Sequence, residues 1–114
     1  MGRTSRDQYL EFYDEVLKEA RAITVAKGSD YSDNERDAGA DTFVNFRTSV
    51  AVGVPPETGI LVRMLDKITR MGTASAKMHR GDIMRVDENI KETAKDLINY
   101  TVIFLAMLEE HNHG

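Results

Sequence analysis

The chain has 114 residues, a formal net charge of −4 and no cysteine. This length predicts a single domain over residues 1–114, large enough to form a hydrophobic core. The lack of cysteine excludes disulfides, thiolate zinc sites and cysteine nucleophiles, and the negative charge argues against general binding to nucleic acid or to acidic membranes.

The sequence carries no signal for a membrane or for export. No apolar run approaches the ~20 residues needed to span a bilayer. The first ten residues, MGRTSRDQYL, lack the apolar core of a signal peptide. We therefore expect a soluble protein of the cytoplasm.

The first predicted element is an amphipathic helix over residues 5–27, followed by a loop. Its apolar residues recur at intervals of three and four, as in Tyr9, Phe12, Tyr13, Val16, Leu17, Ala20, Ile23 and Ala26. Gly28 is expected to end this helix. Residues 28–41 are rich in glycine, serine, aspartate and asparagine, so they are predicted to form a loop.

Two helices are predicted in the middle of the chain. A short one covers about residues 41–52 and ends at Gly53. A long one covers about residues 56–74, because Pro56 and Glu57 are typical of a first helical turn. Residues 75–86 are expected to connect this helix to the last one.

The last predicted helix covers residues 87–108, with Asp87 as its N-cap and a frayed tail after it. Its second half is apolar on nearly every side, and a helix of that kind is buried. One small chain cannot cover such a helix completely. We therefore predict an all-α helical bundle of three long helices and one short helix, with a partner surface that is most simply that of a symmetric homodimer.

The first half of that last helix carries a stripe of polar residues that points toward the core. At about 100° per residue, the stripe contains Glu88, Glu92, Asp96 and Asn99. Half-buried acids need cations, which can be a divalent metal or ion pairs. Asp96 is the strongest candidate, because aspartate is a poor residue for the middle of a helix. Glu88 lies in the first turn, where an acid interacts favourably with the helix dipole without any metal. For Asp96, a structural hydrogen-bond network with Asn99 is the alternative to a metal site.

Other candidate residues lie outside that stripe. Asp66 and Arg70 have the spacing of an ordinary helix ion pair, worth about 0.2–0.5 kcal/mol. If the two long helices pack antiparallel, Asp66 can instead join the acids of the last helix around Mg²⁺. Lys27 and Tyr31 can bind a nucleotide, Lys27 as a cation and Tyr31 as a stacking ring. Alternatively, Lys27 is only the lysine at the end of a helix, and Tyr31 is a loop residue that packs on the bundle.

Several motifs carry a family resemblance. In chain order they are Lys27-x-x-Asp30-Tyr31, Asn45-Phe46, Asp66-Lys67-x-x-Arg70 and Asp87-Glu88-x-x-x-Glu92-Thr93-x-x-Asp96-Leu97-x-x-Tyr100. Together they resemble the MazG-like superfamily of all-α nucleoside triphosphate pyrophosphohydrolases over about residues 20–108. The chain looks most similar to the small phage and prophage branch described as nucleotide modification associated, which would place it in the cytoplasm of a bacterial host.

The resemblance implies assembly as a homodimer or homotetramer, a reaction and a set of site residues. Water would attack between the α- and β-phosphates of a nucleotide, with Mg²⁺ as cofactor, and release a nucleoside monophosphate and pyrophosphate. The implied metal ligands are Asp66, Glu88, Glu92 and Asp96, of which Glu92 and Asp96 would also be catalytic. The implied or candidate contacts to the nucleotide are Lys27, Tyr31, Lys67, Arg70 and Asn99.

The chain departs from the better-known enzymes of the superfamily, which carry E-x-x-E on one helix and E-x-x-D on the next. Here Thr93 stands three residues before Asp96, and Arg63 stands three residues before Asp66. A second hypothesis is therefore a phage nucleotide-binding protein that sequesters a nucleotide or nucleotide signal without cleaving it. A third is a helical interaction module with no small ligand.

Overall fold

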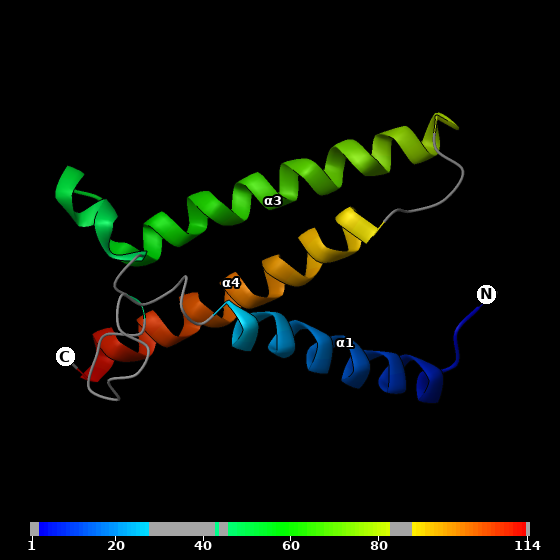
Figure 1. The fold of residues 1–114 in the computed structure, drawn as a ribbon, viewed down its shortest axis with the longest axis horizontal. Helices are drawn as coiled ribbons and strands as arrows, with labels where there is room; N and C mark the ends of the chain where they lie inside the picture. The colour runs from blue at the N-terminus through cyan, green and yellow to red at the C-terminus, as the bar shows by residue number, and fades with distance from the viewer. Residues whose placement is uncertain (1–2, 28–42, 44–45, 83–87, 114) are drawn as a thin grey trace.

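The computed structural model describes residues 3–27, 43, 46–82 and 88–113 (Figure 1). These residues form helix α1 (Arg6–Ala26), the 3₁₀ helix η2 (Thr48–Val52), helix α3 (Pro56–His79) and helix α4 (Glu88–His113). The described parts of the chain contain no strand, which confirms the all-α prediction for them. None of the described helices combines the length and the hydropathy that a membrane crossing needs.

Helix α4 lies at the centre of the fold, with α1 and α3 on either side of it (Figure 1). Helix α3 runs antiparallel to α4, and α1 crosses α4 in roughly the same direction. Within the described residues α1 and α3 make no contact with each other. The two other long helices therefore each pack against α4 and not against each other, which leaves the predicted bundle open on one side in the single chain.

The start of α1 and the end of η2 are each fixed by residues that favour a helix end, Ser5 with Gln8 at the first and Gly53 at the second. Ser5 accepts a hydrogen bond from the Gln8 backbone N–H at 3.2 Å, and the Gln8 side chain accepts one from the Ser5 N–H at 3.0 Å. This reciprocal capping box satisfies two backbone donors at the helix start. Gly53 ends η2 with a φ of 80°, a left-handed conformation that glycine adopts without steric cost.

Other predicted helix bounds were wrong. The short helix covers only Thr48–Val52 of the predicted 41–52, although residues 41, 42, 44 and 45 lie outside the described residues. Helix α3 continues through 75–79, which was predicted as a connector, because these five residues include no glycine or proline. Helix α4 continues past residue 108 to His113 for the same reason. The predicted N-cap Asp87 lies outside the described residues.

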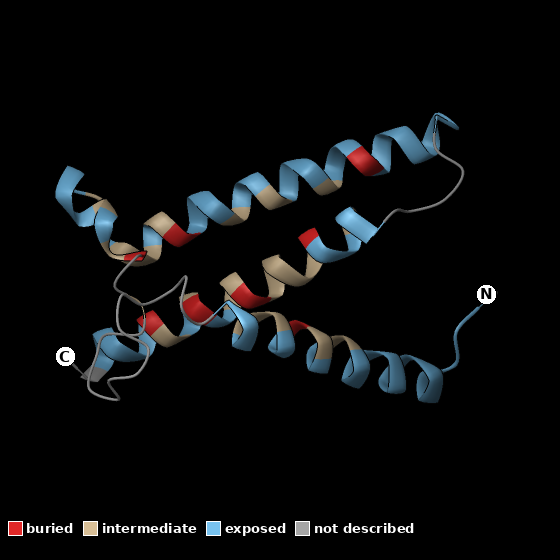
Figure 2. Cartoon of the chain, viewed as in Figure 1, coloured by how far each residue is buried: buried red, intermediate tan, exposed pale blue. Residues whose placement is uncertain are grey.

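The hydrophobic core is small and lies between α3 and α4. Its buried members are Phe46, Ile60, Ile103 and Met107, with Phe43, Met64, Tyr100 and Phe104 packed against them. Much of α1 and α3 is solvent-exposed (Figure 2). Helix α4 is not covered completely by the single chain, as predicted, because Val102, Leu105 and Leu108 are exposed.

Candidate functional site

A polar groove of about 510 Å³ lies between α3 and α4. Its lining consists of Thr69, Arg70 and Thr73 of α3 and of Asn89, Ile90, Glu92, Thr93 and Asp96 of α4. Three residues that the sequence singled out, Arg70, Glu92 and Asp96, therefore share one groove. Glu92 and Asp96 are one helical turn apart on α4, and Arg70 belongs to the opposite helix, so negative and positive groups border the same space.

The threonines of this groove were not predicted as site residues. The Thr73 hydroxyl donates to the Thr69 carbonyl oxygen at 3.1 Å, and the Thr93 hydroxyl donates to the Asn89 carbonyl oxygen at 2.8 Å. Each hydroxyl proton is therefore used within its own helix, which leaves oxygen lone pairs available as acceptors. The i, i+4 spacing of Thr69 with Thr73 and of Asn89 with Thr93 is the signal that could have identified them.

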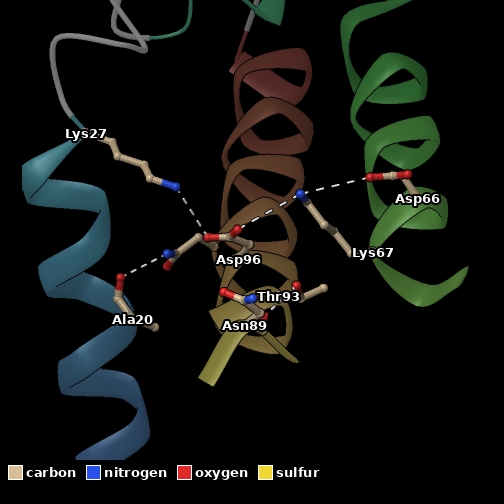
Figure 3. A network of polar contacts seen from close by, with 8 residues as sticks. Ala20, Lys27, Asp66, Lys67, Asn89, Thr93 and Asp96 are labelled. Atoms are coloured by element: carbon tan, nitrogen blue, oxygen red, sulfur yellow. Dashed lines mark hydrogen bonds and ion pairs between the residues drawn. The ribbon is translucent and has the colours of Figure 1, made fainter. Parts of the chain in front are cut away.

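Asp96 is the centre of a network of charges at this groove (Figure 3). Its carboxylate lies 3.6 Å from the Lys27 Nζ, at the end of α1, and 4.0 Å from the Lys67 Nζ, on α3. The Lys67 ammonium group also lies 5.9 Å from the centre of the Tyr100 ring. All three long helices thus contribute to one partly buried site. The two separations exceed normal hydrogen-bond lengths, so an anionic ligand can compete for the lysines.

Asp66 pairs with neighbours on its own helix. Its carboxylate lies 3.4 Å from the Arg70 Nε and 4.0 Å from the Lys67 Nζ. The i, i+4 contact with Arg70 is the ordinary ion pair that the sequence allowed. Because Lys67 pairs with both Asp66 and Asp96, one lysine links the acid of α3 to the acid of α4 (Figure 3).

Glu88 and Asn99 do not line the polar groove. Glu88 lies 3.3 Å from Lys91, and it lines a separate hollow between α1 and α4. The buried Asn99 side chain donates a hydrogen bond of 2.9 Å to the Ala20 carbonyl oxygen, which ties α4 to α1. Asn99 thus has a structural partner in the described chain. Tyr31, the predicted stacking ring, lies outside the described residues.

Metal ligands are the next feature of the groove. Among them, no three acidic or histidine side chains gather closely enough to hold an ion. Mg²⁺, however, is usually bound by one or two carboxylates together with substrate phosphates and water, and not by an all-protein cage. Glu92 and Asp96 supply two carboxylates at the groove. The described residues alone therefore do not form a metal centre, and two carboxylates match the number that Mg²⁺ usually takes from a protein.

A second link between α1 and α4 is the ion pair of Glu19 with Lys95. The hydrogen bond from the Lys95 ammonium group lowers the pKa of Glu19 below its ordinary value, and the same bond raises the pKa of Lys95. The stabilisation from Glu19 is therefore present above the unfolded-state pKa of about 4.3 and is lost as the pH falls through the lower folded-state pKa. The stabilisation from Lys95 is present below about pH 10.4 and is lost as the pH rises through the raised folded-state pKa.

We expect Glu19→Gln to lower the melting temperature near neutral pH and to have a smaller effect in acid. The difference from the unchanged protein should shrink as the pH falls from about 7 to below the unfolded-state pKa of about 4.3, because Glu19 then loses its charge first in the unfolded state and, at lower pH, in the folded state. Thermal melts across this range measure the difference. Glu11→Gln, at an exposed position of the same helix, is the matched control. A difference that does not depend on pH would contradict the assignment.

Comparison of the chain with models of known families, with curated proteins and with solved structures finds no match.

Proposed function

We propose that this protein is a Mg²⁺-dependent nucleotide pyrophosphohydrolase, which converts a nucleoside triphosphate into a nucleoside monophosphate and pyrophosphate. The observation that supports the proposal best is the shared groove, in which Glu92 and Asp96 of α4 lie opposite Arg70 of α3. Hydrolysis of a phosphoanhydride needs a base or metal to activate water and positive charge to hold the phosphates.

The cations around the groove would hold the phosphates. Arg70 belongs to the groove wall, and Lys27 and Lys67 flank Asp96 from opposite helices. When a triphosphate binds, its oxygens can replace the Asp96 carboxylate as partners of the two lysines, since phosphate groups accept charge-assisted hydrogen bonds. Arg70 can similarly exchange its contact with Asp66 for a bidentate contact with phosphate.

The two carboxylates would have different roles. Within the described residues no cation lies at ion-pair distance from Glu92, so Glu92 is better placed to accept the proton of the attacking water. Asp96, which two lysines already contact, is better placed to orient the ion and the phosphates. A Mg²⁺ ion bound together with the nucleotide would activate the water and neutralise charge on the phosphates.

The product assay is the direct test. The purified protein is incubated with a panel of ribo- and deoxyribonucleoside triphosphates and Mg²⁺, and the products are resolved by anion exchange. We expect equal amounts of monophosphate and pyrophosphate. Glu92→Gln should lower the rate by about 100-fold or more, the loss typical of a general base. Glu11→Gln is the control. Release of single orthophosphates would reject this reaction.

A second candidate function is a protein that binds a nucleotide without cleaving it. One argument for it is that two ammonium groups already offset the charge of Asp96. Another is that Thr93 and Arg63 stand at positions where the better-known enzymes of the superfamily that the chain resembles carry acids. Binding without pyrophosphate release after prolonged incubation, and release of an intact nucleotide on denaturation, would favour this candidate. If neither Mg²⁺ nor any nucleotide shifts the melting temperature, a helical interaction module becomes the better explanation.

A further inference from the structure

Arg63 of α3 lies over an aromatic ring of the hydrophobic core. Its guanidinium carbon is 4.8 Å from the centre of the Phe46 ring, a separation at which the negative face of the ring attracts a cation. Phe46 is only 5 % exposed and belongs to the core cluster. Because a buried ring is a fixed platform, this contact holds the guanidinium of an otherwise exposed arginine in one place.

Arg63 differs from the other cations of this part of α3 because it has no acidic partner. Within the parts of the chain that the structure describes, no carboxylate lies at ion-pair distance from Arg63. Arg70, by contrast, contacts Asp66, and Lys67 contacts both Asp66 and Asp96. Contact with a ring face leaves the N–H donors of a guanidinium able to bind an anion. The positive charge that no acid offsets is therefore at Arg63.

Arg63, Lys67 and Arg70 form a row along α3, which we call the α3 cation row. Their spacing of four and three residues places them on one side of the helix, and the row is about 10 Å long, because each residue adds about 1.5 Å. Arg70, at one end, lines the polar groove. Lys67, in the middle, contacts Asp96 (Figure 3). The row thus leads out of the groove along α3 and ends at Arg63.

Two aromatic rings hold Arg63 and Lys67 beside each other. The Lys67 ammonium group lies 5.9 Å from the centre of the Tyr100 ring. The Tyr100 and Phe46 rings meet edge to face, with their centres 6.2 Å apart. Each cation therefore lies over its own ring, and the two rings are neighbours. Positive charge is held at two adjacent points, which fits a chain of phosphates better than a single phosphate ion.

We propose that Arg63 binds the terminal phosphate of a nucleoside triphosphate, and that the α3 cation row thereby selects a triphosphate over the corresponding diphosphate. The proposal rests on the proposed function, since it takes the phosphates nearest the nucleoside to lie in the groove beside Arg70. The terminal phosphate carries the most charge and would reach the cation that no acid offsets. The better-known enzymes of the superfamily that the chain resembles carry an acid at this position, so the resemblance does not imply this contact.

The first test measures the binding of inorganic tripolyphosphate by titration calorimetry in a buffer without Mg²⁺. Arg63→Gln should raise the dissociation constant by about tenfold or more, the loss expected when a hydrogen bond to a charged group is removed. Arg80→Gln is the matched control, because it removes the same charge at the far end of α3, where Arg80 pairs with Asp82. It should change the constant by less than about twofold. Equal effects of the two substitutions, or no binding to the unchanged protein, would overturn the proposal.

The second test identifies the phosphate that Arg63 contacts. The triphosphate and diphosphate of each common nucleoside are titrated into the protein without Mg²⁺. Arg63→Gln should raise the dissociation constant of the triphosphate by about tenfold or more and that of the diphosphate by less than about threefold, because a diphosphate held in the groove does not extend to Arg63. Arg63→Lys keeps the charge and should recover part of the affinity. Equal weakening of both nucleotides by Arg63→Gln would overturn the proposal. Circular dichroism verifies that each variant remains helical.

Neither titration measures cleavage, so this proposal and the proposed reaction can fail separately. If the protein releases no pyrophosphate, the reaction is rejected, whereas a selective loss of triphosphate affinity in Arg63→Gln still supports the contact. If the protein releases pyrophosphate but Arg63→Gln leaves both the KM and the dissociation constant of the triphosphate unchanged, only the Arg63 contact is rejected.

Discussion

Replacement of Asp96 by asparagine is expected to lower pyrophosphate release by about 100-fold or more, the range of a catalytic carboxylate, whereas Glu88→Gln should change it by less than about threefold. Asp96 lines the groove and contacts lysines from two other helices. Glu88 lies outside the groove and pairs with Lys91 on its own helix. Rates with saturating nucleotide and Mg²⁺ measure the difference. Equal and small effects of both substitutions would remove the case for a carboxylate site in this groove.

The same variant separates the hydrolase from the protein that only binds. Asparagine keeps the size of the side chain but removes the negative charge beside Lys27 and Lys67. If Asp96 helps to hold Mg²⁺ with the nucleotide, Asp96→Asn should weaken binding in the presence of Mg²⁺. If the site only binds phosphates through its cations, loss of the carboxylate should tighten nucleotide binding, because the phosphates no longer compete with it. Calorimetric titrations with and without Mg²⁺ distinguish these results.

The helices could be predicted where the sequence contains a local signal. The apolar spacing of residues 9–26 and the Pro56-Glu57 start led to α1 and α3, and Gly53 correctly marked the end of η2. The ends of α3 and α4 were placed too early, because polar residues were taken as a sign of a connector. Lysine, glutamate and alanine favour a helix even where no apolar face continues, and the helix proceeds until a breaker such as Gly81.

The site depended more strongly on contacts between distant residues. The sequence analysis could name antiparallel packing of α3 and α4 only as a condition for a shared site. In the structure this packing places Arg70 opposite Glu92 and Asp96. The contact of Lys27 with Asp96 and the hydrogen bond of Asn99 with Ala20 depend on how α1 crosses α4, and a helical pattern in one segment does not specify that crossing angle. The sequence therefore supplied the candidate residues, and the packing of the helices determined which of them share the groove.

Replacement of Ile60 by alanine is expected to lower the free energy of unfolding by about 2–5 kcal/mol, the usual cost of removing a large buried aliphatic side chain. Ile60 is 1 % exposed and packs in the cluster with Phe46, Ile103 and Met107. Because this cluster is small, removal of the Ile60 side chain should cost a large fraction of the 5–15 kcal/mol by which a domain is typically stable. Urea unfolding, followed by circular dichroism at one fixed protein concentration, measures the change.

Val62→Ala is the matched control, since Val62 lies two residues away on α3 and is 61 % exposed. It should change the free energy of unfolding by less than about 0.5 kcal/mol, as exposed substitutions usually do. Similar losses in the two variants would mean that Ile60 is not the anchor between α3 and α4. Because the same two helices form the walls of the polar groove, Ile60→Ala should also weaken nucleotide binding as the temperature approaches its lowered midpoint, whereas Val62→Ala should not.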